Sequence, residues 1–248
     1  MELTELVFEQ YKCFENEQTL EVRPLTVLIG ANSSGKSVIA RLPLLLAHAF
    51  SVQAEGPLDL TFDELDFGGS FSDLVYNRLP HAAVRLGASF LVGGKKLTII
   101  TETRYFEEVK SQLVEQVSLS IEKHPILSIT WNGEDPIRDS EKYILDLPDK
   151  AAELKFKGLL PEASKDDLPD EAKVLLENLR QWVSSVHYLG PFRNQPQRLY
   201  RYPQSSVDYV GHSGNRASFT ARSALGVRLV ATYMDKGENN YYDAEKIG

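Results

Sequence analysis

The feature that most constrains this chain is the stretch at residues 30–37, Gly-Ala-Asn-Ser-Ser-Gly-Lys-Ser, in which four residues separate a glycine from Gly-Lys-Ser. Glycines let the backbone curl so that successive N–H groups point inward at an anion. A lysine at this spacing reaches the outer phosphates of a nucleotide, and the hydroxyl after it ligates Mg²⁺. The stretch therefore predicts a loop that binds ATP and Mg²⁺, with Ser37 on the metal, Lys36 assisting catalysis, and nucleotide contacts from Gly30, Asn32, Ser33, Ser34, Gly35, Lys36, Ser37 and Val38.

The residues on either side of this loop fit the prediction. Residues 25–29 form a short apolar run with β-branched members, which predicts a buried parallel strand. Residues 36–53 carry apolar side chains at helical spacing, and Pro43 should kink this helix or end its first segment. A strand, a glycine loop and a helix in this order are the context that a phosphate-binding loop requires.

Composition excludes several classes of protein. A chain of 248 residues that is 42% apolar suits one globular domain, with or without an inserted subdomain. Its single cysteine excludes a disulfide framework and a cysteine zinc cluster, and it fits a reducing cytoplasm. The net charge of −8 argues against a surface that binds nucleic acid everywhere, but leaves a local basic groove open. Arg41 and Pro43 interrupt the longest apolar stretch, so we expect no membrane span.

The middle of the chain has a different pattern. Residues 82–131 alternate apolar and polar side chains around a Gly-Gly turn at 93–94, which predicts an antiparallel meander with one wet face. Residues 132–169 are polar and contain prolines, which favours irregular structure, whereas 170–186 has helical spacing and 186–189 predicts a second core strand. Residues 63–73 contain a short acidic cluster formed by Asp63, Glu64, Asp66 and Asp73. We interpret these side chains as parts of solvated turns and helix caps, and a metal site is the alternative.

Three stretches together resemble the ABC-type ATPase heads of the RecF, SMC and OLD (overcoming lysogenization defect) proteins. They are Asn32 within the loop, residues 6–14 with Tyr-Lys-Cys-Phe at 11–14, and residues 20–30. The resemblance covers the first fifty residues strongly and the remainder more loosely, although 65–75 looks like a segment of bacterial OLD-like ATPases. It implies an α/β P-loop NTPase fold: an ABC-type lobe with an N-terminal β-hairpin and an antiparallel β-subdomain beside a P-loop core. It also implies that Lys12 lies near the nucleotide.

The resemblance divides the 1–248 chain into a P-loop core at 1–57, a β-subdomain with an insertion at 58–169, and a return to the core at 170–248. The last part contains a segment at 187–198 that is similar to the Q-loop of such heads. In that reading Gln195, with Gln197 behind it, binds Mg²⁺ and the attacking water, and Arg193 contacts phosphate or a partner head. The alternative for Arg193 is a structural ion pair. Arg198 belongs to a basic-aromatic run that suits either DNA contact or a solvated loop.

Two elements that such a head needs are missing from this sequence. We find no Ser-Gly-Gly-type signature to cap the γ-phosphate of an opposite subunit, and no apolar strand that ends in Asp-Glu. In the family these elements come later than the point where this chain stops. The resemblance therefore implies the N-terminal half of a head, and an ATPase that is incomplete in this chain.

Three functional hypotheses follow. The first is an ATP-binding ATPase subunit or domain of an OLD/RecF-like complex, which dimerises around ATP and regulates a DNA-directed effector such as a nuclease or toxin, by analogy with bacterial anti-phage defence. The second is a non-hydrolysing, nucleotide-dependent assembly module that scaffolds a separate effector. A P-loop kinase or transferase is the third, but we find no acceptor site or lid for it. The implied partners are a homo-oligomer of heads, the effector and DNA, without a membrane.

Overall fold

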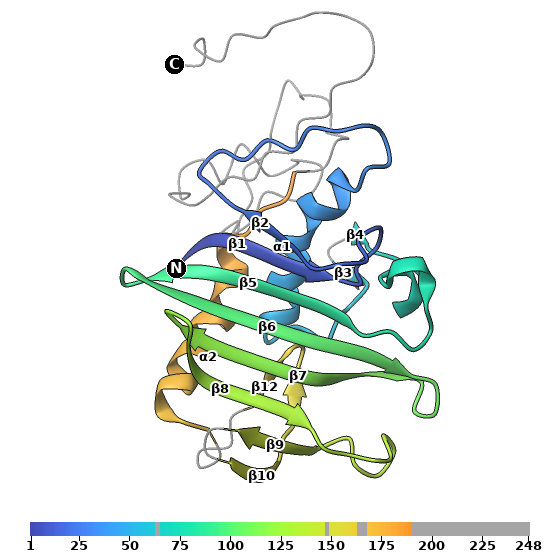
Figure 1. Cartoon of the computed structure of the whole chain (residues 1–248), viewed down its shortest axis with the longest axis vertical. Coiled ribbons are helices and arrows are strands. Elements are labelled where there is room, and N and C mark those ends of the chain that lie inside the picture. The colour runs from blue at the N-terminus through green and yellow to red at the C-terminus, as the bar shows by residue number, and fades with distance from the viewer. Residues whose placement is uncertain (63–64, 147–148, 163–167, 190–248) are drawn as a thin grey trace, which may run out of the picture.

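The computed structural model describes residues 1–62, 65–146, 149–162 and 168–189, and its main element is an eight-stranded antiparallel sheet in the order β10-β9-β8-β7-β6-β5-β1-β2 (Figure 1). The strands of this sheet are β1 (Glu2–Glu9), β2 (Gln18–Glu21), β5 (Val84–Val92), β6 (Lys95–Phe106), β7 (Ser111–Ile121), β8 (His124–Trp131), β9 (Lys142–Asp146) and β10 (Asp149–Glu153). Two short hairpins lie outside it, formed by β3 (Thr61–Phe62) with β4 (Leu65–Asp66) and by β11 (Phe156–Lys157) with β12 (Leu160–Pro161).

The meander from β5 to β8 confirms the prediction for residues 82–131. On β6, Leu97 and Ile99 are buried on one face while Thr98 lies on the other and shares a hydrogen bond with Ser89 of β5, 3.0 Å between the hydroxyl oxygens. This period of two buries a continuous apolar layer and leaves a wet face, as expected for an antiparallel sheet covered on one side.

Two helices cover the apolar face of the sheet (Figure 1). They are α1 (Lys36–Phe50) and α2 (Asp170–Trp182), and a 3₁₀ turn, η3 (Val183–Ser185), follows α2. The Trp182 ring packs between Phe50 of α1, at 6.3 Å between centroids, and Phe90 of β5, at 4.8 Å with the rings edge to face. Both predicted helices are therefore present, and α1 continues through Pro43 rather than ending there.

The predicted parallel strand at residues 25–29 is wrong for the described structure. All strand pairs of the eight-stranded sheet are antiparallel, and 25–29 joins none of them. A local turn begins the segment, because the backbone N–H of Arg23 donates to Thr26 Oγ1 over 2.9 Å, and Pro24 has no N–H for a ladder. The apolar side chains of the run are left in solvent, with Leu25 80%, Val27 68% and Ile29 91% exposed.

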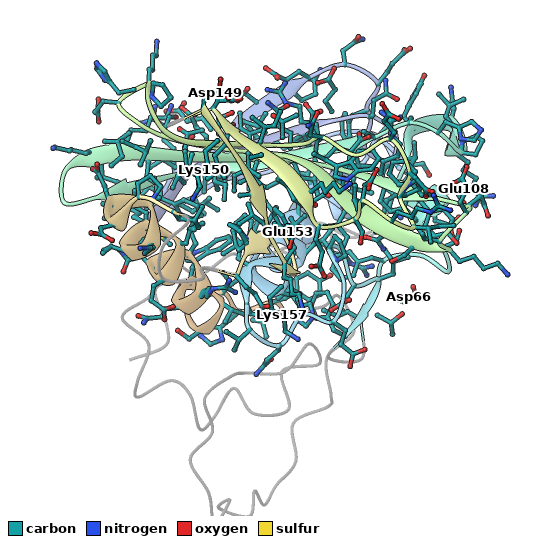
Figure 2. The ribbon with its side chains drawn as sticks, turned by 90° about the horizontal axis from the view of Figure 1, so that it is seen from below. Asp66, Glu108, Asp149, Lys150, Glu153 and Lys157 are labelled. Carbon is teal, nitrogen blue, oxygen red and sulfur yellow. The ribbon has the colours of Figure 1, made fainter. Side chains whose placement is uncertain are left out.

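Two further predictions need correction. The region at 132–169 is not irregular throughout, because β9 and β10 add to the edge of the meander and Figure 2 shows charged side chains such as Asp149 and Glu153 on the outermost strand. Charges on an edge strand are a usual defence against further pairing. The expected core strand at 186–189 is absent, since only Tyr188 makes an isolated bridge there. Within the described ranges no helix is long and apolar enough to cross a membrane.

Candidate functional site

The loop at residues 30–37 leads directly into α1. The ammonium of Lys36 donates hydrogen bonds to the main-chain carbonyls of Gly30 and Ala31, with N···O distances of 2.8 and 2.6 Å. The loop is thus curled around its own lysine. Gly35 precedes the helix with φ +89° and no side-chain cap, and the first turn of α1 contains no acidic residue. The free N–H groups and the positive end of the helix dipole are therefore not neutralised locally.

The turn after β1 packs against this loop at Gly35. A Cβ atom built on Gly35 would lie 2.7 Å from Cys13 Sγ and 2.8 Å from the ring of Phe14. The Phe14 ring is itself fixed by Phe8, at 4.9 Å between centroids. The structure thus brings part of the predicted Tyr-Lys-Cys-Phe patch against the loop, and the contact leaves no room for a side chain at position 35.

Lys12 belongs to the same turn but is directed elsewhere. Its backbone N–H donates to the Leu74 carbonyl over 2.6 Å, and its ammonium donates to the Phe67 carbonyl. Burial lowers the pKa of this ammonium, an effect that the carboxylates of Asp73 and Asp66 partly offset. The expected contact of Lys12 with a nucleotide is thus not preformed, because the amine is held by the segment after β4.

The acidic residues near this site act in turns and caps where they are described. Asp73, the last residue of the short 3₁₀ helix η1 (Phe71–Asp73), accepts the backbone N–H of Ser70 at 3.0 Å and so caps the start of η1, which η2 (Tyr76–Arg78) follows. This hydrogen bond is the main reason that the pKa of the Asp73 carboxyl is lowered. Asp66 accepts the N–H of Gly68 at 2.8 Å. No group of three or more histidine, cysteine or acidic side chains within the described residues is placed to hold a metal ion.

Arg41 is the residue that sequence reasoning missed. It lies four residues after Ser37 on α1, and its Nε donates to Tyr188 Oη over 3.2 Å while the guanidinium carbon lies 5.8 Å from the centroid of the Tyr188 ring. Its Nη1 also donates to the Asp66 carbonyl at 3.4 Å. Burial raises the pKa of the nearby Tyr11 phenol, and the charge of Arg41 opposes that rise. An arginine among the apolar residues of α1 was the available signal.

Several predicted site residues fall outside the part of the chain that the structure describes. These are Arg193 and Gln195, the reserve candidate Gln197, Arg198, and the acidic residues Asp63 and Glu64. Their predicted roles stay predictions. The loop residues themselves are described, and Asn32, Ser33, Ser34 and Ser37 are exposed to solvent.

Several solved structures resemble this chain, and two of them are described here. No family model and no curated protein matches the chain. One structure comes from work on ATP-driven dimerization and DNA-stimulated activation of SMC ATPases; it is 17% identical over 50% of this chain and 72% of its own, with a TM-score of 0.33. The other is an SMC head domain from Thermotoga maritima, 20% identical over 51% of this chain and 39% of its own, with a TM-score of 0.28. Neither likeness places the chain in a family.

Proposed function

We propose that residues 30–37 and the first turn of α1 bind the phosphates of ATP. The observation that carries the proposal is the hydrogen bonding of Lys36 to the carbonyls of Gly30 and Ala31, which curls the loop in front of an uncapped helix start. A phosphate at this position exchanges those two carbonyls for charge-assisted contacts with Lys36 and gains the free N–H groups of the helix. The contacting set is the predicted one, including the backbone of Gly30, Asn32, Ser33, Ser34, Gly35 and Val38.

Mg²⁺ fits this site through oxygen ligands, as its chemistry demands. The Ser37 hydroxyl is exposed on the first turn of α1, and bound phosphates supply further oxygens. When bound, the metal neutralises charge that develops on the phosphates. Gln195 is proposed as a further ligand, and Arg193 and Lys12 as further phosphate contacts.

We also propose that the chain is part of an ABC-type ATPase head that more polypeptide completes. Leu25, Val27 and Ile29 are exposed, although the run at 25–29 has the pattern of a buried strand. Exposed apolar runs of this kind mark contact surfaces. In this proposal the completed head dimerises around ATP and regulates a DNA-directed effector such as a nuclease, as in anti-phage systems.

The second candidate, a non-hydrolysing assembly module, has its own supporting observation. Among the described residues no carboxylate is hydrogen-bonded or ion-paired to the loop at 30–37, so no general base is in place there. Nucleotide would then act by holding subunits together. ATP turnover compared with ATP-dependent oligomerisation separates the two candidates, because only an ATPase combines dimerisation with turnover in the usual range of about 1–10³ s⁻¹.

The test of the nucleotide site is Lys36→Ala, measured by calorimetry with ATP and Mg²⁺. Loss of a charge-assisted contact worth about 1.5–3 kcal/mol predicts at least about a tenfold weaker affinity. The matched control is Lys95→Ala, because Lys95 is an exposed lysine at the start of β6 and not part of the loop. Equal affinity of the Lys36→Ala and wild-type chains contradicts the proposal.

A further inference from the structure

The cations around the start of α1 differ in their partners from those of the sheet. On the sheet, the guanidinium of Arg85 pairs with Glu9, Glu17 and Glu102, and the Lys96 ammonium pairs with Glu5 at 2.7 Å. Around α1, three half-buried cations are hydrogen-bonded to neutral oxygens, and no carboxylate in the described part of the chain lies within ion-pair distance of them. They are Lys12 on the Phe67 carbonyl, Lys36 on the Gly30 and Ala31 carbonyls, and Arg41 on Tyr188 Oη and the Asp66 carbonyl.

Arg41 is the member of this group that no motif accounts for. Positions 37 and 41 lie on the same face of α1, separated by about 6 Å along the axis. The Tyr188 hydroxyl and ring hold the guanidinium in place. The Asp66 residue offers Arg41 its main-chain oxygen, whereas its carboxylate accepts from Gly68 and lies at the surface, as Figure 2 shows.

Neutral partners leave the charge of a guanidinium uncancelled. A carboxylate in the place of Tyr188 would neutralise Arg41 and remove its field beyond a few ångströms, whereas a phenol fixes the group and leaves the field intact. In a chain whose net charge is −8, Lys36 and Arg41 at one end favour an anion there. The charge is half-buried, so salt screens it less than a charge in open solvent.

We propose that Arg41 is a further anion-recognition residue of this site, held by Tyr188 so that its charge favours nucleoside triphosphates over nucleotides with fewer phosphates at residues 30–37. The inference rests on the proposed nucleotide site and adds a residue that selects for ligand charge. Arg41 acts through its field and not by contact with the ligand. The competing explanation is that Arg41 only ties α1 to Asp66 and Tyr188.

Calorimetry with ATP, ADP and AMP at low and high salt distinguishes recognition of ligand charge by Arg41 from a purely structural role of Arg41. Arg41→Gln should weaken ATP binding by about three- to tenfold, ADP binding less and AMP binding least, and the loss should shrink at high salt. Arg41→Lys should restore most of the affinity. Tyr188→Phe keeps the charge and the ring but loses the hydrogen bond, so ATP affinity should stay within about twofold of wild type.

The control is Arg78→Gln, since Arg78 is a nearby cation that Asp73 already neutralises at 3.0 Å, and it should leave all three affinities unchanged. Three outcomes overturn the inference: equal losses for ATP and AMP, no rescue by Arg41→Lys, or a Tyr188→Phe loss as large as that of Arg41→Gln. If Arg41→Gln does not fold, Arg41→Met takes its place as the neutral variant that is compared with Arg41→Lys. ATP binding that requires Lys36 but ignores Arg41 overturns this inference and leaves the nucleotide site standing, whereas a wild-type chain without ATP affinity overturns both.

Discussion

Strand β6 and the run at residues 25–29 both carry large apolar side chains, and these side chains lie in opposite environments. On β6, Ile99 is fully buried between paired neighbours. In the run before the loop, Ile29 is 91% exposed, with no strand beside it among the described residues. The apolar pattern of a segment therefore indicates which side chains would be stabilised by burial, whereas burial itself requires a neighbouring segment of the chain.

The charges differ between the same two regions. The wet face of the sheet satisfies its cations with carboxylates, as the three glutamates around Arg85 show. Around the start of α1, Lys36 and Arg41 are hydrogen-bonded to neutral oxygens instead. Arg85 is thus paired with carboxylates of the sheet, while no carboxylate among the described residues is ion-paired with Lys36 or Arg41.

The largest expected effect on stability comes from a substitution in the buried part of the sheet. Ile99→Ala removes buried methyl groups from the centre of the sheet and should lower the free energy of unfolding by about 2–5 kcal/mol. Urea denaturation followed by tryptophan fluorescence measures it. A loss below about 1 kcal/mol would break the comparison, because the sheet would then not be the stable part of the chain.

An intermediate effect is expected where the two regions meet. Gly35→Ala forces an L side chain to φ +89° and places its Cβ against Cys13 and Phe14, which should cost about 1–3 kcal/mol. Gly93→Ala is the matched control, because Gly93 has φ +56° and nothing within 4 Å of the added Cβ. The excess loss in Gly35→Ala therefore measures the close approach alone, and equal losses in the two variants would show that the contact with Cys13 and Phe14 is not formed in solution.

The smallest expected effect on stability comes from a substitution in the run at residues 25–29. Ile29→Ala makes the same chemical change as Ile99→Ala in a side chain that is 91% exposed, so the free energy of unfolding of this chain should change by no more than about 0.5 kcal/mol. The same denaturation experiment measures it. A loss that approaches that of Ile99→Ala would mean that residues 25–29 are buried in this chain.

Prediction from the sequence succeeded where local pattern and final environment agree. The meander follows from period-two alternation around the turn at 93–94, and α1 and α2 follow from helical spacing. Strand β10 was missed because its sequence, Asp-Lys-Ala-Ala-Glu, carries a weak apolar signal, and β9 was missed because Lys-Tyr-Ile-Leu-Asp is a short run within a polar stretch that contains prolines. They form because β8 offers an open ladder, to which β9 pairs while Tyr143 and Leu145 turn into the core.

By itself, the sequence determined the helix that begins at Lys36 and the side of each long strand that faces the core, and it predicted a phosphate-binding loop at residues 30–37. Each of these depends on residues that are close together in the chain. The tertiary structure alone decided that Gly35 rests on Cys13 and Phe14, that residues 25–29 stay exposed, and that Tyr188 holds Arg41 without neutralising it. These features join positions far apart in sequence, and the burial and pairing of a side chain depend on which distant segment arrives beside it.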